Sequence, residues 1–335
     1  MLLGNSLLGV IAIAVPACFI FISYSFLAQN LGGESFGLIL IAQSISFFMM
    51  IFDFGLNNSI IKFYTEYYSK KRYEFCSSLI KSIFVCLFFI GVFVSSLIWL
   101  CSGFLVNLFR IDYELVNEAI ITIRIIGIQT LFMFLINFNV SLFKSIERFD
   151  LYAYSTIFFS LIVYGSMSFY SINAETVVDV ITASLVSHII AFIVIQLIAI
   201  KIMSQVGVVL SKGSFNFSLL RELIPYSLFI SIHSIFALAF NHGVRIFIGI
   251  NFTLLDVSIF TITINLINKV LELMSAATEF LFPLISKNRD LLKFRKIYLS
   301  YLIGITILSS LFYVMILTFG DQILKLWLGK EIGGQ

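Results

Sequence analysis

Apolar residues recur along this chain in windows that are separated by short polar joints. The windows are 6–28, 37–56, 79–101, 117–142, 151–172, 177–201, 222–248, 255–284 and 297–319. An α-helix of about twenty residues crosses the ~30 Å hydrocarbon core of a bilayer, and each window is close to that length. The pattern therefore predicts an all-α fold, a polytopic transmembrane bundle of about nine spans.

Composition excludes a soluble protein. Of the 335 residues, 60% are apolar and 12% are charged, and the mean hydropathy is +1.06. Soluble domains carry about 25% charged residues, so this chain cannot cover a water-facing surface. The first window has full spanning length and lacks a cleavage pattern, so we expect a retained helix and not a signal peptide.

The cations in the joints predict the orientation of the spans. Fifteen Lys and Arg residues lie in the even-numbered joints, whereas the odd joints and the tail hold four, namely Arg110, Arg245, Lys325 and Lys330. Cytoplasmic loops carry an excess of Lys and Arg. We therefore expect a multi-pass protein of the bacterial inner membrane with its N-terminus in the cytoplasm.

A weak internal repeat divides the chain. The first and seventh windows each hold a proline followed by an apolar run that ends in Asn, from Pro16 to Asn30 and from Pro225 to Asn241. Transporters are often built from two related halves. We expect an N-terminal six-helix half (1–203), a cytoplasmic linker (204–217) and an incomplete C-terminal half of three helices (218–335), with Pro16 and Pro225 as gating bends. Because the chain ends soon after its ninth window, it reads as C-terminally truncated.

Polar residues in the eighth window fall on one helical face. Asn265, Asn268, Lys269, Glu272 and Glu279 lie within about a third of the circumference at ~100° per residue. Lipid penalises such groups, so the stripe must face protein or a watery cavity. One interpretation is a local pair of Lys269 with Glu272 that joins helices. The other is a substrate cavity in which Lys269 meets a diphosphate.

Four further charged or titratable residues lie in the other windows. Arg124 either extends to the membrane interface or binds phosphate, and both interpretations stay open. His188, near the middle of its window, is either satisfied by a neighbouring hydroxyl or functional. Arg245 closes the seventh window. Asp53 lies near the cytoplasmic end of the second, where we expect it to cap a helix or to pair with a cation such as Lys62 as part of a gate.

Signatures of enzymatic chemistry are absent from the sequence. There is no P-loop, no HExxH, no GxSxG and no Cys/His cluster with metal-ligand spacing. Cys18, Cys76, Cys86 and Cys101 also lack a disulfide pattern, so we expect them to be packing residues. The sequence predicts neither an enzyme nor a cofactor, metal or nucleic-acid site.

Several stretches resemble Wzx-type O-antigen flippases of the multidrug/oligosaccharidyl-lipid/polysaccharide exporter superfamily. The opening "LLGNSLLGVIAIAVPACFIFISYSFLAQNLGGESFG" and "FDFGLNNSIIKF" are similar to that family's first helix and to the end of its second. "NHGVRIFIG" falls where the family often carries an acid before the arginine, and here Val244 replaces that acid. The elements "EFLFPLISKN" and "ILKLWLGKEI" are also similar.

The resemblance implies a transporter working by alternating access. Its cargo would be an undecaprenyl-diphosphate-linked sugar unit for O-antigen or other surface polysaccharide, as in lipopolysaccharide biosynthesis, and its partners a glycan polymerase and chain-length proteins besides membrane lipid. One alternative is a drug or cation antiporter of the same superfamily, with Glu272 or Glu279 holding the cation. Another is a membrane-embedded glycan polymerase or acyltransferase, although the outer joints are short and nearly featureless.

Overall fold

The fold is a bundle of long helices, as the apolar windows predict. The computed structural model describes residues 2–208, 213–265, 267–268 and 291–328. In this part of the chain, eight helices are long and apolar enough to cross a membrane. They are Ile11–Leu31, Gly33–Asp53, Tyr73–Leu108, Tyr113–Ser145, Phe149–Ser171, Val177–Gln205, Phe217–Asn251 and Leu302–Gly320. The predicted window 255–284 begins with the shorter helix Leu254–Asn265 and continues outside the described residues.

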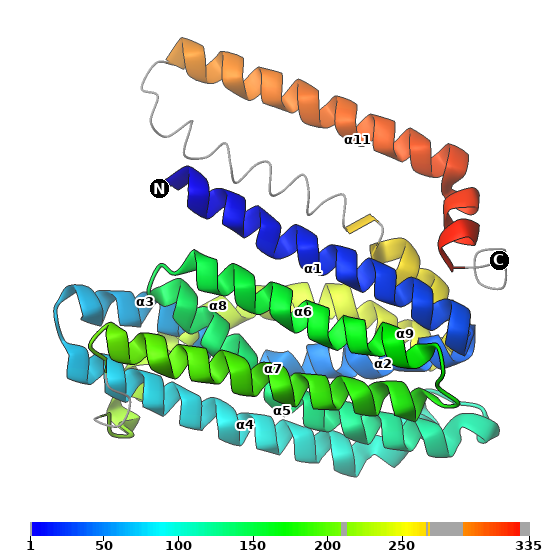
Figure 1. Cartoon of the computed structure of the whole chain (residues 1–335), viewed down its shortest axis with the longest axis horizontal. Helices are drawn as coiled ribbons and strands as arrows, with labels where there is room; N and C mark the ends of the chain where they lie inside the picture. The colour runs from blue at the N-terminus through cyan, green and yellow to red at the C-terminus, as the bar shows by residue number, and fades with distance from the viewer. Residues whose placement is uncertain (1, 209–212, 266, 269–290, 329–335) are drawn as a thin grey trace.

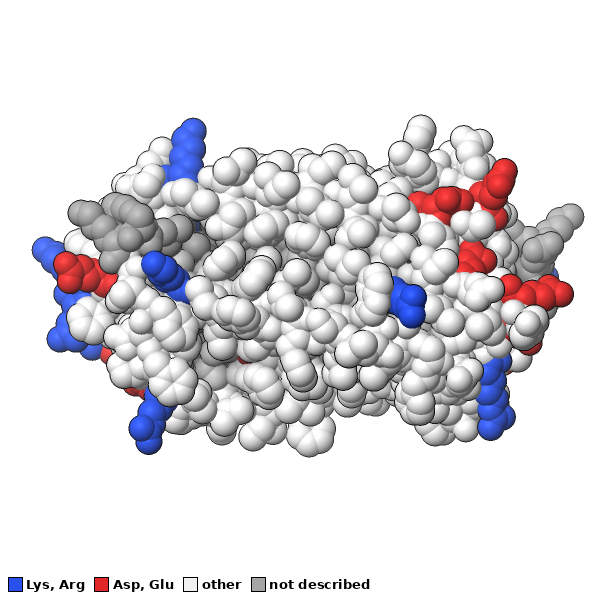
Figure 2. Space-filling model, turned by 90° about the horizontal axis from the view of Figure 1, so that it is seen from below, with Lys and Arg blue, Asp and Glu red and all other residues white. Residues whose placement is uncertain are grey.

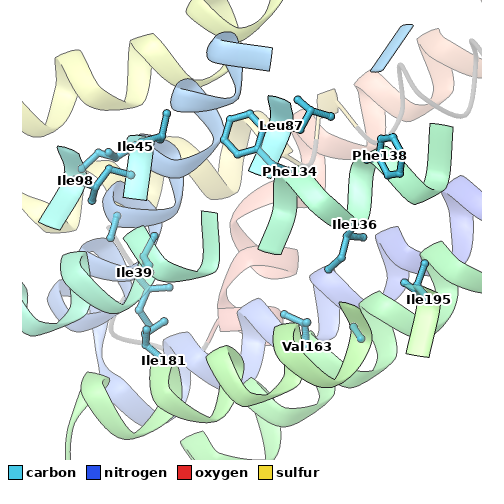
Figure 3. Close-up of a cluster of buried hydrophobic side chains, with 14 of the residues drawn as sticks. Ile39, Ile45, Leu87, Ile98, Phe134, Ile136, Phe138, Val163, Ile181 and Ile195 are labelled. Carbon is cyan, nitrogen blue, oxygen red and sulfur yellow. The ribbon is translucent and has the colours of Figure 1, made fainter. Parts of the chain in front are cut away.

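The first half is built around one central helix. Helix α5 (Val116–Ser145) packs against α4 (Tyr73–Leu108) and α7 (Val177–Gln205) on one side and against α2 (Gly33–Met49) on another. Helix α1 (Leu2–Leu31) runs along α6 (Phe149–Ser171), as Figure 1 shows. In the close-up of Figure 3, Phe134 of α5 lies beside Leu87 of α4, and Ile136 lies towards Val163 of α6.

Charged residues collect at the two ends of the bundle and leave an uncharged belt between them (Figure 2). We call one end the cation-rich end; it carries Lys62, Lys70, Lys71, Arg72, Lys144 and Arg148. Apolar side chains are exposed around the belt, for example Phe89 at 66% and Leu100 at 81%. Such exposure would be costly in water but suits lipid, so the chain is a multi-pass membrane protein.

At the cation-rich end the chain turns a corner that the apolar pattern does not reveal. The 3₁₀ turn Met50–Asp53 ends at Phe54 and Gly55, which adopt left-handed φ values of 49° and 73°. Helix α3 (Leu56–Ser69) then occupies what the sequence suggests is a polar joint. It is amphipathic, with a buried face that includes Ile60 and Tyr64, and so it lacks a full apolar window.

The second half starts with α8 (Phe217–Leu238), whose first turn is capped by Asn216. Because the Asn216 side chain accepts hydrogen bonds from two backbone N–H groups, the helix begins at this point. A π-helical turn, Ala239–Gly243, leads into α9 (Val244–Asn251), and α11 (Leu291–Leu328) is the last described helix. Helix α7 ends at Gln205, so the expected linker lies between α7 and α8. The superposition of the two halves stays a prediction.

Orientation is testable directly from the placement of the cations. Reporter fusions in the α3–α4 corner, at Lys71, are expected to behave as cytoplasmic, because four cations cluster at residues 62–72. Fusions near Glu114, between α4 and α5, are expected to behave as external. Alkaline phosphatase activity from a Lys71 fusion would contradict this orientation.

Candidate functional site

A cavity of about 270 Å³ lies inside the first half, among α1, α2, α5, α6 and α7. We call it the inner cavity. Its walls combine amides, hydroxyls and aromatic rings with aliphatic side chains. They are Ile20, Gln43, Ser46, Phe47, Ile126, Gln129, Met133, Asn137, Phe159, Ser160, Val163, Tyr164 and His188. None of these residues carries a carboxylate.

A second cavity of about 230 Å³ adjoins the first. The two share Met133, Asn137, Phe159 and Ser160, and the second extends along α1 past Pro16. Pro16 is therefore a wall residue on α1, whereas Pro225 of α8 is exposed. Together the cavities form a continuous partly polar space between α1, α5 and α6, deep in the apolar belt.

His188 lies in the wall of the inner cavity and is 5% exposed. Its Nδ1 is 2.8 Å from the carbonyl oxygen of Ser184, and its ring meets the edge of Phe159 with centroids 5.2 Å apart. A backbone carbonyl accepts only a donated hydrogen, so Nδ1 carries the proton here. The sequence interpretation of a nearby partner and that of a functional position are therefore compatible.

The junction between the halves contains a buried arginine. Arg245, on α9, is 8% exposed, and its Nη2 donates a 2.8 Å hydrogen bond to Oδ1 of Asn265. Asn265 is also hydrogen-bonded to Tyr24 of α1. Tyr24 and Tyr164 lie near the guanidinium, and within the described part of the chain its Nε has no hydrogen-bond partner.

This arginine is therefore a cation without a paired carboxylate among the described residues. Burying an ion costs several kcal/mol unless partners compensate for the lost water. Asn265 supplies one neutral acceptor for Arg245, and no ion pair to the guanidinium occurs in the described ranges. The geometry leaves charge available at the junction, next to Tyr164 in the wall of the inner cavity.

The π-helical turn positions this arginine. It widens the helix at Ala239–Gly243, just before Val244 and Arg245. The ring of His242 in this turn stacks on Phe47 of the inner cavity, with centroids 4.9 Å apart. π-Turns occur frequently at functional sites, and no simple residue pattern marks them.

A seam of contacts joins the halves at the cation-rich end. The hydroxyls of Ser59 and Ser227 are 2.5 Å apart, and Nζ of Lys62 lies 3.8 Å from the ring centroid of Tyr226. The Tyr67 hydroxyl donates to Glu222 over 3.3 Å. Burial, and then the Glu222 carboxylate, raises the pKa of Tyr67 above its usual value, so this phenol stays protonated.

Asp53 lies beside this seam but does not pair with Lys62. Its carboxylate accepts hydrogen bonds from the backbone N–H and the side-chain amide of Asn57, each at 3.1 Å. The acid therefore caps the first turn of α3, where the helix dipole favours it. Lys62 instead lies over Tyr226, because it is on the face of α3 that meets α8.

At the opposite end, α11 docks on α1 through one tryptophan. The ring of Trp327 stacks on Phe21 at a centroid distance of 3.6 Å, and its Nε1 donates to the Phe21 carbonyl over 2.9 Å. The Trp327 carbonyl accepts from Gln29 at 2.9 Å and from the Ser25 hydroxyl. Helix ends leave carbonyls without intrahelical partners, and this contact satisfies one of them.

Arg124 is separate from both cavities. Its Nε donates to Oγ of Ser102 at 3.0 Å, and the guanidinium lies 5.3 Å from the ring centroid of Trp99, which is 43% exposed. The arginine thus bridges α5 and α4 near the surface. Lys269, Glu272 and Glu279 lie outside the described residues, and Asn268 is half-buried.

Comparison with known proteins identifies the architecture. Residues 10–166 match the MatE family model. The inward-facing conformation of a multidrug resistance MATE family transporter of the MOP superfamily matches with a TM-score of 0.68 at 16% identity, covering 97% of this chain and 78% of that one. The chain has the MATE transporter fold.

Two further MATE-fold structures are similar. The multidrug transporter DinF-BH in complex with a rhodamine dye matches with a TM-score of 0.73 at 15% identity, over 99% of this chain and 82% of that one. A MOP superfamily transporter from Pyrococcus furiosus, described as having a binding pocket of reverse polarity that suggests a different function, matches at 0.65 and 18% identity, over 98% and 75%. No functionally curated protein matches the sequence.

Within this MATE fold, several site residues escaped the sequence analysis. Gln43, Gln129, Tyr24 and Tyr164 all lie in apolar windows. The two glutamines did carry a signal, because amides are costly in lipid and so face protein or a cavity. Of the candidates named from sequence, the structure brings Arg245 and Asn265 together and places His188 in the inner cavity. The described residues contain no cluster that could hold a metal ion.

Proposed function

We propose that this protein is a membrane transporter that moves amphipathic organic molecules of the drug or cation type by alternating access between its two halves. The observation that carries the proposal is the partly polar inner cavity deep in the apolar belt. A helical bundle with only a structural role would fill this space with side chains. The MATE fold supports the proposal, since structures with this fold include multidrug transporters.

The chemistry of the cavity suits an aromatic, partly polar cargo. Phe47, Phe159 and Tyr164 offer ring faces and edges, while Gln43 and Asn137 offer amide donors and acceptors. Aromatic faces attract organic cations without a buried carboxylate, and the attraction strengthens when water is excluded. We therefore favour a drug-type cargo over the lipid-linked oligosaccharide that the sequence resemblance implies.

The lipid-linked oligosaccharide remains a second candidate, because of Arg245. A buried guanidinium that faces no carboxylate in the described part of the chain suits an anionic group such as a diphosphate, which it can bind through two N–H groups. The flippase assignment and the sites at Lys269, Glu272 and Glu279 stay proposals.

A dye-efflux assay tests the leading proposal. Cells without their own multidrug exporters should accumulate less of a cationic rhodamine dye when they express this protein, and Ser160→Phe should restore accumulation. Ser160 lines both cavities and is 4% exposed, so a phenyl group there would fill the shared space. Gly165→Phe is the matched control, since open space surrounds that position on the same helix.

The two candidates predict different failures. If the protein never lowers accumulation of the dye but restores surface glycan in a strain lacking its flippase, the oligosaccharide assignment replaces the drug assignment. Normal efflux by Ser160→Phe would show that the shared cavity is not on the transport path.

A further inference from the structure

A third cavity, of about 190 Å³, lies outside the proposed transport path. It is a crevice between α4 and α7 with α5 as its floor, on the other side of α5 from the inner cavity. Its lining residues are Ile80, Lys81, Phe84, Phe138, Asn139, Leu142, Gln196 and Ala199. We call it the α4–α7 crevice.

The floor of this crevice is polar although its rim faces lipid. Nδ2 of Asn139 donates to Oε1 of Gln196 over 2.9 Å, and Asn139 is fully buried. Oδ1 of Asn139 has no hydrogen-bond partner in the described ranges. A buried carbonyl oxygen without a donor costs roughly 1–3 kcal/mol, so the site suits an occupant that brings a donor.

A cation stands at the mouth of the crevice. Nζ of Lys81 donates to the backbone carbonyl of Gly213 over 2.9 Å, and an ammonium has three donors, so two remain for another acceptor. Lys81, Asn139 and Gln196 all lie near the cation-rich ends of their apolar windows. This is the level at which lipid phosphates sit in a bilayer.

The rim of the crevice has the chemistry of an acyl-chain surface. Phe88 and Phe89 of α4 are 39% and 66% exposed, and Ile193 and Leu197 of α7 are 49% and 61% exposed. These apolar flanks continue from the crevice towards the middle of the belt. A free phosphate ion would leave them uncovered, whereas a lipid would cover them with its acyl chains.

We propose that the α4–α7 crevice binds an anionic glycerophospholipid of the cation-rich leaflet, with its phosphate on Lys81 and a headgroup hydroxyl donating to Asn139 Oδ1. Phosphatidylglycerol has this chemistry, since it carries one net negative charge and two headgroup hydroxyls. Phosphatidylcholine lacks both the net charge and the donor.

The site also touches the linker between the halves. Gly213, whose carbonyl Lys81 binds, belongs to the segment that leads into α8. The Ser82 hydroxyl accepts a hydrogen bond from the backbone N–H of Asn216 at 2.9 Å. The bound lipid would therefore share its lysine with the segment that joins the two halves, so lipid binding and the position of the second half are coupled.

Native mass spectrometry of the purified full chain tests this proposal with phosphatidylglycerol and phosphatidylcholine. The wild type should bind phosphatidylglycerol at least about ten-fold more tightly than phosphatidylcholine, because a charge-assisted hydrogen bond contributes on the order of ten-fold or more. Lys81→Gln should remove this preference, and Lys81→Arg should keep it. Millimolar inorganic phosphate should not displace the lipid.

Two more variants guard the interpretation. Lys70→Gln is the matched control, because Lys70 is an exposed lysine at the same end, paired with Glu66 at 2.6 Å, and it should bind lipid as the wild type does. Ala199→Leu fills the crevice and leaves Lys81 intact, so it should weaken binding even if Lys81→Gln fails to fold. Equal binding of both lipids by the wild type, wild-type affinity in Ala199→Leu, or an equal loss in Lys70→Gln would overturn the proposal.

Discussion

Replacing Arg245 by alanine is expected to reduce transport at least ten-fold while the protein still inserts into the membrane. The guanidinium is buried at the junction of the halves and joins α9 to Asn265 and, through it, to Tyr24 of α1. Without it Asn265 loses a charged donor, which costs about 1–3 kcal/mol at a buried site. The variant also loses the only described cation at this junction, on which an anionic part of a cargo would depend.

The measurement is the initial rate of efflux, or of glycan export, at matched protein levels. Arg245→Lys keeps the charge but loses the planar fork of donors, so it should retain partial activity. Arg110→Ala is the control, since Arg110 is an exposed arginine outside the junction. Wild-type transport by Arg245→Ala would contradict a role for this residue in either proposed function.

Replacing Gly55 by alanine is expected to give the largest loss of stability. Gly55 has a φ of 73°, and a left-handed conformation costs other residues roughly 1–2 kcal/mol. A Cβ at this position would also overlap the backbone carbonyl oxygen of Ser227 on α8. The seam at the cation-rich end would have to separate, and the Ser59–Ser227 hydrogen bond would be lost with it.

Thermal unfolding in detergent, followed by near-ultraviolet circular dichroism, measures this effect. We expect the midpoint of Gly55→Ala to fall by several degrees. Gly103→Ala is the matched control, because a Cβ there meets no atom within 4 Å. Equal midpoints for the two variants would show that the seam tolerates a side chain at residue 55.

The sequence predicts the spans well because the bilayer imposes one length on every helix that crosses it. The apolar windows that begin at residues 79, 117, 151 and 177 each fall within one membrane-length helix. The same criterion misses α3, since an amphipathic helix at the membrane surface needs no full apolar window.

The candidate site was predictable only in part. Arg245, Asn265 and His188 are conspicuous in sequence because each is a polar group in an apolar window. Their partners Tyr24, Tyr164 and Phe47 are ordinary membrane residues, and only the folded chain shows what they face. Lys62 illustrates the reverse case, because its cation–π contact with Tyr226 depends on how α3 meets α8 and not on nearby acids.

The docking of α11 on α1 gives the protein an intrinsic optical signal. The chain contains two tryptophans, Trp99 and Trp327. Trp327 is 8% exposed and stacked on Phe21, whereas Trp99 lies on α4 and is 43% exposed. In a Trp99→Phe background, fluorescence would come from Trp327 alone. Its emission maximum would then record when α11 leaves α1, and an alternating-access cycle would be followed without any attached label.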